Sequence, residues 1–401
     1  MKRFFRTLIL LFAALAALAA ERPDSLFAEI DSIVKELSEI TGLKMIRPVP
    51  HEMMSRDQLR RFIENKIQEE VKPEEIRAEE AALKLFGFLP PDFNLERATI
   101  ELLTEQAAAF YDYHRGRLYV INAHSDDMQQ MALVHELAHA LADEHFRLER
   151  FIKKVESADD ASIARLAVME GQASWITFEY MARKMGRSLK NSPDLLKSMA
   201  TMMHAASGQY PVFDHAPLYL RESLLFPYTA GMLFQQSVIE KVGQAGFTEV
   251  FKRPPSSSQQ ILHPEKYFAR EEPTQPRLPR LPPASGAKKL IEGSFGELDH
   301  SILLRQYCGQ DAAALAANWR GSRFVVLESR DGRKTLAYVS EWRDPEAARA
   351  FFDQYKTVLE KKWKRCEWER QTRELLTGAG DTGRFEVRVS GALVTSLEGL
   401  P

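Results

Sequence analysis

The stretch Met131-Ala-Leu-Val-His135-Glu136-Leu-Ala-His139-Ala-Leu141 holds the strongest chemical signal in this chain. Its surroundings, from about residue 126 to residue 146, predict one long helix. Two helical residues four positions apart lie one turn apart on the same face, so both imidazoles can point at one ion. Two neutral imidazoles are good zinc ligands but leave a tetrahedral site incomplete. The motif therefore predicts a metal centre that takes a further ligand from elsewhere.

Glu136 stands next to the first histidine, where its carboxylate can reach a metal-bound water rather than the metal itself. Zinc lowers the pKa of such a water toward about 7, and a carboxylate beside it can take the proton. Apolar residues surround the motif and predict that it is buried. A buried histidine pair without a ligand would be costly. We therefore expect Glu136 to act as a base in a metal-assisted hydrolysis.

Three residues are candidates for the third ligand. Glu170 comes first, because it lies on an otherwise apolar predicted helix, where an acidic side chain needs a partner. His145 comes second: it has the spacing of a metzincin site, but Ala142 replaces the glycine turn of that site, and a continuous helix would direct His145 away. Asp143 comes third, because its short side chain starts one full turn beyond His139. It is better suited to accept a hydrogen bond from a metal-bound histidine.

Length, composition and net charge limit the number of domains and the class of partner. The chain has 401 residues, of which 45% are hydrophobic and 27% charged, as in ordinary globular proteins. This length predicts two or three domains. The net charge is −2, and no strongly basic region is present. Sequence-independent binding of nucleic acid phosphates requires clustered lysine and arginine, so we expect no nucleic acid partner.

The N-terminus has the pattern of a secretory signal peptide. Lys2, Arg3 and Arg6 precede an apolar run, residues 8–18, and a small-x-small cleavage pattern follows at residues 17–19. We expect an exported protein, periplasmic or secreted. The alternative is an uncleaved anchor, and only then would we expect membrane association; the apolar run is short for a membrane span.

Hydrophobic periodicity predicts an α+β fold. It predicts a helix at 25–41 that Gly42 closes and a second helix that begins near Ser55. Two aromatic and β-branched runs, residues 110–113 and 118–122, flank a turn with Gly116 and indicate a β-hairpin. The two cysteines, Cys308 and Cys366, could be bonded or free, because sequence alone does not give their distance. The predicted division is a signal peptide at 1–20, a helical N-terminal region at 21–100, a mostly helical catalytic domain with a short hairpin at 101–267, a proline-rich linker at 268–288 and a small α+β domain at 289–401.

The His-Glu-Leu-Ala-His motif, followed by Glu170-Gly-Gln-Ala, resembles gluzincin-type zinc metallopeptidases. More narrowly, the chain is similar to a group of exported bacterial proteins. These share Phe-Tyr-Asp at residues 110–112 and the segment Pro-Pro-x-Ser-x-x-Gln-Ile-Leu-His-Pro-Glu-Lys-Tyr at residues 254–267. The resemblance spans about residues 100–270. One departure is Ser174, where many gluzincins have an aspartate that supports a zinc-bound histidine; Ser174 or Asp143 could replace it, or nothing does.

The resemblance implies a zincin-like catalytic domain that binds Zn²⁺ through His135, His139 and Glu170 and cleaves a peptide or protein substrate. It also implies a downstream donor that stabilises the oxyanion, for which His263 and Tyr228 are the candidates. The strand at residues 118–122 would then be the sheet edge against which a substrate pairs.

Two alternatives stay open. In the first, the chain is a non-catalytic scaffold that keeps a zinc core for its structure and binds a partner through the C-terminal domain. The presence of Glu136 and the lack of an obvious fourth ligand favour the enzyme, because a structural site needs four protein ligands and no base. In the second, residues 22–100 form a pro-region that keeps the enzyme latent.

Overall fold

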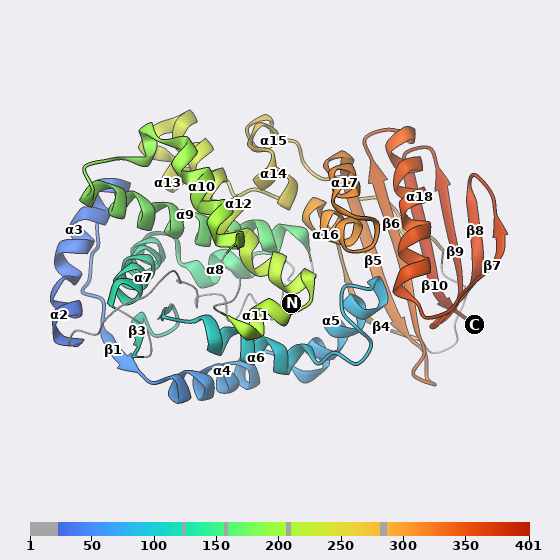
Figure 1. Cartoon of the computed structure of the whole chain (residues 1–401), viewed down its shortest axis with the longest axis horizontal. Coiled ribbons are helices and arrows are strands. Elements are labelled where there is room, and N and C mark those ends of the chain that lie inside the picture. Colours follow the sequence, from blue (N-terminus) through green and yellow to red (C-terminus); the bar gives the residue numbers. More distant parts are fainter. Residues whose placement is uncertain (1–22, 123–125, 156–158, 206–209, 281–286) are drawn as a thin grey trace.

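The computed structural model describes residues 23–122, 126–155, 159–205, 210–280 and 287–401. The predicted signal peptide at residues 1–20 lies outside these ranges. Within them the chain is mixed α+β, with a helical part followed by a C-terminal sheet (Figure 1). None of the described helices combines the length and the apolar character that a membrane crossing requires.

The first part of the chain is helical, as its periodicity predicts. The stretch predicted as one helix at 25–41 forms two, α2 and α3. The second ends at Gly42 as predicted, and the φ of 75° at Gly42 is the left-handed conformation that glycine adopts readily. The next helix begins at Ser55, where Ser55 and Gln58 accept hydrogen bonds from each other's backbone N–H groups. The elements are α2 (Pro23–Ala28), α3 (Ile30–Thr41), β1 (His51–Met54), α4 (Arg56–Glu70), α5 (Pro73–Phe86) and α6 (Leu95–Gln106).

The predicted hairpin is formed by β2 (Ala109–Asp112) and β3 (Arg117–Ile121). The prediction that the strand at residues 118–122 forms a sheet edge is wrong. β1 arrives from the N-terminal region and pairs with β3 in parallel, so the sheet order is β1-β3-β2 and its edges are β1 and β2. The predicted N-terminal region and catalytic domain thus share one sheet.

The remaining helices surround the long helix predicted from about residue 126 to residue 146. That helix, α7, spans Asp126–Phe146, and two 25-residue helices, α9 and α12, pack against each other next to it. In Figure 1, α13, α14 and α15 lie along the upper side of this part, and α11 lies lower, next to α6. The elements are α7 (Asp126–Phe146), α8 (Leu148–Lys153), α9 (Asp160–Lys184), η1 (Leu189–Asn191), α10 (Pro193–Ala205), α11 (Pro211–His215), α12 (Leu218–Val242), η2 (Gly243–Ala245), α13 (Gly246–Lys252), α14 (Ser258–Leu262) and α15 (Pro264–Ala269).

The C-terminal part is a seven-stranded antiparallel sheet in the order β4-β5-β6-β10-β9-β8-β7. Two helices, α16 and α18, lie against one face of it (Figure 1). Residues 271–280, within the predicted linker, have neither helix nor strand. The elements are β4 (Lys288–Gly293), α16 (Glu297–Cys308), α17 (Gln310–Ala313), η3 (Ala314–Asn318), β5 (Trp319–Glu328), β6 (Lys334–Trp342), α18 (Pro345–Lys362), β7 (Cys366–Gln371), β8 (Leu375–Gly380), β9 (Gly383–Ser390) and β10 (Leu393–Leu400).

The two parts share a hydrophobic core. Phe86, at the end of α5, packs edge-on against Phe295, Phe324 and Tyr338, with ring centroids 4.5, 5.5 and 5.3 Å away. Close aromatic packing of this kind is favourable beyond the area it buries. The N-terminal helices are therefore anchored on the C-terminal sheet as well as on the small sheet of the helical part.

Candidate metal centre

The two histidines of the motif meet a glutamate from another helix. His135 and His139 lie one turn apart on α7, with their Nε2 atoms 3.1 Å from each other. Oε2 of Glu170, on α9, lies 3.2 Å from each of these atoms. All three side chains are buried, and among the described residues they form the group whose ligand atoms are close enough to hold a metal ion.

Glycines on two helices allow Glu170 to reach this position. A Cβ on Gly171 of α9 would lie 2.1 Å from the backbone carbonyl carbon of Gly231 on α12, and a Cβ on Gly231 would lie 2.3 Å from the backbone oxygen of Ala167. Real side chains cannot come so close, so the two helices touch through backbone alone. Glu170 is one residue before Gly171 on α9, and Tyr228 is three residues before Gly231 on α12. Both side chains therefore lie close to the point where the two helices touch.

Burial and mutual charge decide the protonation of this group. Burial lowers the pKa of His135, because the charged imidazolium is poorly solvated there. Burial alone would raise the pKa of Glu170, but His139 and His135 outweigh it and the pKa is lowered. The pKa of Glu136 is raised well above its ordinary value, first by burial and then by the charge of Glu170.

The hydrogen bonds within the group are incomplete. Two Nε2 atoms and one carboxylate oxygen face one another, and a single proton cannot satisfy all three pairs. Within the described ranges, Oε1 of Glu136 and Oε1 of Glu170 are buried without a hydrogen-bond partner. Buried polar atoms without partners are rare and call for an explanation. A cation between two imidazole nitrogens and a carboxylate would satisfy this donor set, and the residues present fit one.

Tyr228 lies next to the three candidate ligands. Its ring is stacked on that of His135 with 6.0 Å between the centroids. Its pKa is raised well above the ordinary value by burial, by the charges of Glu170 and Glu136 and by a hydrogen bond with Glu170. The structure thus brings this sequence candidate into the group.

His263, the other candidate donor, lies elsewhere. It sits between α14 and α15, where its Nε2 is 2.8 Å from Oε1 of Glu297 on α16 and its Nδ1 is 3.6 Å from Oε1 of Glu265. Neither of these ion pairs reaches the histidines of α7. The structure places His263 at the junction of the helical part and the C-terminal sheet.

The lower-ranked ligand candidates have other partners. The Nε2 of His145 is 3.0 Å from the backbone oxygen of Lys44, at the end of α7. Asp143 accepts hydrogen bonds from Leu148 N at 2.8 Å and from the Tyr111 hydroxyl at 3.3 Å. Ser174 is buried on α9, one turn after Glu170. The continuous helix keeps His145 off the histidine face, as the sequence predicts.

Tyr111 is the residue whose role the sequence did not suggest. Its backbone N–H, on β2, donates to Oε2 of Glu136 at 2.9 Å. This bond connects the outer side of the edge strand β2 to the predicted base. In the sequence, Tyr111 belongs to an aromatic strand shortly before the motif and to the Phe-Tyr-Asp triplet at residues 110–112, but neither signal gives a register against α7.

Comparison with known proteins adds one finding. Residues 236–401 match a family model described as a domain of unknown function, DUF8575. The match covers less than half of the chain and leaves out α7 and α9, which hold the three candidate ligands. No curated protein and no solved structure matches the chain.

Proposed function

We propose that this chain is an exported zinc-dependent hydrolase of peptide bonds. The observation that supports the proposal most is that His135, His139 and Glu170 converge at one buried point, with Glu136 next to the first of them. Two imidazoles and one carboxylate are a frequent ligand set of catalytic zinc.

His135, His139 and Glu170 would hold the ion. When bound, zinc supplies Lewis acidity, which polarises a carbonyl group and makes water more acidic. The described part of the chain offers three ligands at this point. A structural zinc site usually has four protein ligands, whereas a catalytic site keeps one position open, so the ligand number favours catalysis.

Glu136 is suited to the role of base by its geometry. Its Oε2 is fixed by the Tyr111 N–H at 2.9 Å, which orients the carboxylate. Its Oε1 has no partner within the described ranges and can accept a proton from water. Tyr228 is suited to donate a hydrogen bond to the developing charge on the carbonyl oxygen, because its ring lies against His135.

The outer edge of β2 holds the base in place. Tyr111 N points from β2 toward Glu136 on α7, and all four residues of β2 are buried. This edge therefore orients Glu136 rather than pairing with an extended peptide.

Metal analysis tests the proposal at its first step. Wild type purified without chelators should contain one zinc per chain, whereas His139→Ala and Glu170→Ala should contain none. His145→Ala is the matched control and should retain zinc, because this histidine contacts Lys44 O. Elemental analysis measures all four proteins, and a wild type without stoichiometric zinc would overturn the proposal.

The second step separates an enzyme from a scaffold. Glu136→Gln keeps the shape of the side chain but cannot take a proton, so we expect normal zinc content and a loss of peptide cleavage of at least about 100-fold. Cleavage is measured by mass spectrometry on a broad peptide library. A wild type that binds zinc but cleaves no peptide in this library would favour the scaffold alternative.

A further inference from the structure

The segment that joins β4 to α16, with the first turn of α16, contacts the first turns of α9 and α12. These two helices bring Glu170 and Tyr228 to the cluster that also contains His135 and His139 of α7. We call this segment, residues 294–299, the corner. The backbone N–H of Asp160, the first residue of α9, donates to Ser294 Oγ at 3.1 Å. The Tyr219 hydroxyl, at the start of α12, donates to Oδ1 of Asp299 at 2.9 Å. Oδ2 of Asp299 accepts from Gly296 N at 2.8 Å, which holds the corner itself in shape.

The fit at the corner is close. A Cβ on Gly296 would lie 2.0 Å from Oδ1 of Asp160, so the carboxylate occupies the space of the missing side chain. Oδ2 of Asp160 accepts from Ser258 N at 2.7 Å, and Ser258 Oγ accepts from Leu298 N at 3.2 Å. The start of α9 is therefore bound to the corner both directly and through α14.

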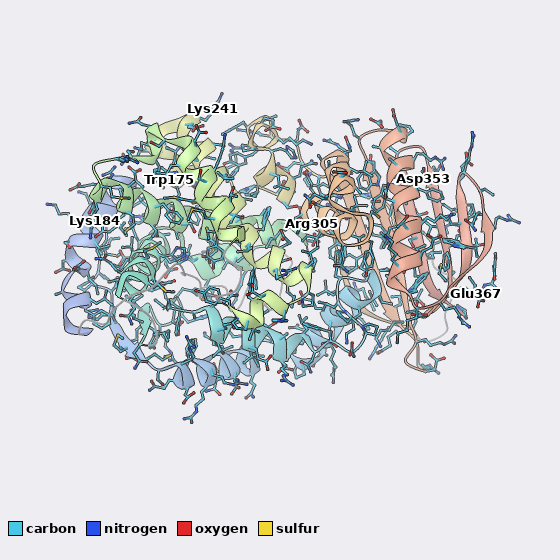
Figure 2. The ribbon with its side chains drawn as sticks, in the orientation of Figure 1. Trp175, Lys184, Lys241, Arg305, Asp353 and Glu367 are labelled. Atoms are coloured by element: carbon cyan, nitrogen blue, oxygen red, sulfur yellow. The ribbon has the colours of Figure 1, made fainter. Side chains whose placement is uncertain are left out.

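An ion pair also joins α12 to α16. Nη2 of Arg305 lies 2.6 Å from Oε1 of Glu222, one turn after Tyr219. Figure 2 shows Arg305 between the helical part and the C-terminal sheet. The ring of Tyr219 also packs on Phe88, with 4.3 Å between the centroids. The start of α12 is thus held by polar and apolar contacts together.

Each helix runs from the corner to the cluster over a similar length. Glu170 follows Asp160 by ten residues and Tyr228 follows Tyr219 by nine, which correspond to about 15 Å and about 14 Å along a helix. Pro227 removes one hydrogen bond from α12 just before Tyr228, so the place of Tyr228 depends on packing at both sides. That packing is the backbone contact of Gly231 on one side and the corner on the other.

We infer that Asp160 and Tyr219 are positioning residues through which the C-terminal domain sets Glu170 and Tyr228 relative to each other. The inference rests on the proposed function, because it assigns these residues to the same metal site. It makes the C-terminal domain a part of the hydrolase rather than a separate binding module. Asp160 and Tyr219 would act along α9 and α12, over about 15 Å and about 14 Å of helix.

The test compares two tyrosines that each lose one hydroxyl. Tyr219→Phe keeps the ring against Phe88 but loses the bond to Asp299. The control Tyr267→Phe loses a bond to the backbone oxygen of Arg253, at 2.8 Å, while its ring packs on Phe234 in the C-terminal half of α12. Three quantities are measured in the full chain: zinc affinity by chelator competition, the visible spectrum of the cobalt-substituted protein, and hydrogen exchange of α9 and α12 in the metal-free protein.

We expect Tyr219→Phe to lower zinc affinity by about tenfold, to change the cobalt spectrum and to speed exchange around Glu170 and Tyr228. Tyr267→Phe should match wild type in all three. If Tyr219→Phe folds poorly, Ser294→Ala, which removes the bonds of this hydroxyl to Asp160 N and to Asp159 Oδ1 at the start of α9, should give a smaller change of the same kind. Wild-type values for both corner variants would overturn the inference and leave the proposed function standing, whereas a wild type without zinc would remove the proposed function itself.

Discussion

Two buried acidic clusters, one in each part of the molecule, differ in how completely they are paired. In the C-terminal domain, Oε1 of Glu398 accepts from the Tyr355 hydroxyl at 2.7 Å and from Ser396 Oγ at 3.0 Å, and Oε2 lies 2.5 Å from Lys362 Nζ. Lys362 also donates to the backbone oxygen of Leu85 at 3.0 Å. Both carboxylate oxygens of Glu398 therefore have donors, and we call this cluster closed.

The cluster on α7 and α9 is buried too, but some of its oxygens have no hydrogen-bond donor among the described residues, and we call it open. Oε2 of Glu170 faces two imidazole nitrogens, while Oε1 of Glu170 and Oε1 of Glu136 have no hydrogen-bond partner in the described part of the chain. A buried charge that is fully hydrogen-bonded serves as a structural element. A buried group with unsatisfied atoms calls for an explanation, and here a cation between the three side chains supplies one. Burial alone would not have separated the two clusters; the pairing of individual atoms does.

The largest expected effect comes from breaking the closed cluster. Lys362→Met should lower the free energy of unfolding by about 3–5 kcal/mol, because Glu398 would stay buried without its cation. Glu170→Gln, made in the metal-free protein, should change it by less than about 1 kcal/mol, because a buried charge with incomplete pairing is removed. Urea unfolding monitored by circular dichroism measures both. Equal destabilisation by the two substitutions would contradict the distinction between closed and open clusters.

An intermediate effect is expected from adding metal. With free zinc at 100 times its dissociation constant, the metal-free protein should gain about 2.7 kcal/mol of stability. Differential scanning calorimetry should show this gain in wild type and in Lys362→Met, which leaves the open cluster intact. His139→Ala should show no gain, and a gain of wild-type size in that variant would place the zinc elsewhere.

The smallest effect is expected from a half-exposed pair that joins the two parts. Glu297 raises the pKa of His263 above its ordinary value, chiefly by a hydrogen bond. The charged histidine therefore stabilises the fold below about pH 6.5, and this stability is lost as the pH rises through the higher pKa of the folded state.

Relative to His263→Gln, wild type should thus lose stability between pH 6 and pH 8, by about 1 kcal/mol or less because the pair is partly solvated. Thermal unfolding at a series of pH values gives the difference between the two proteins. A wild type that gained stability relative to the variant over this interval would show that the pair has the opposite sign.

Local patterns predicted most helices well. The bounds of α7, the cap of α4 at Ser55 and the end of α3 at Gly42 agree with the sequence prediction, because each depends on residues within a few positions. The pairing of β1 with β3 joins residues more than sixty positions apart, and no short pattern contains it. For that reason the sequence placed the sheet edge on the wrong strand.

The sequence by itself determined the helix with His135, Glu136 and His139, because their spacing already sets them on one helical surface. It also ranked Glu170 first among the candidates for the third ligand, because an acidic residue on an apolar helix needs a partner. Only the tertiary structure decided between Tyr228 and His263 as a neighbour of this group. Tyr228 reaches it through the backbone contact of Gly171 with Gly231, and His263 pairs with Glu297 instead. The reason is physical: a helical repeat is fixed by bonds along the chain, whereas the meeting of two helices is fixed by which surfaces can approach each other.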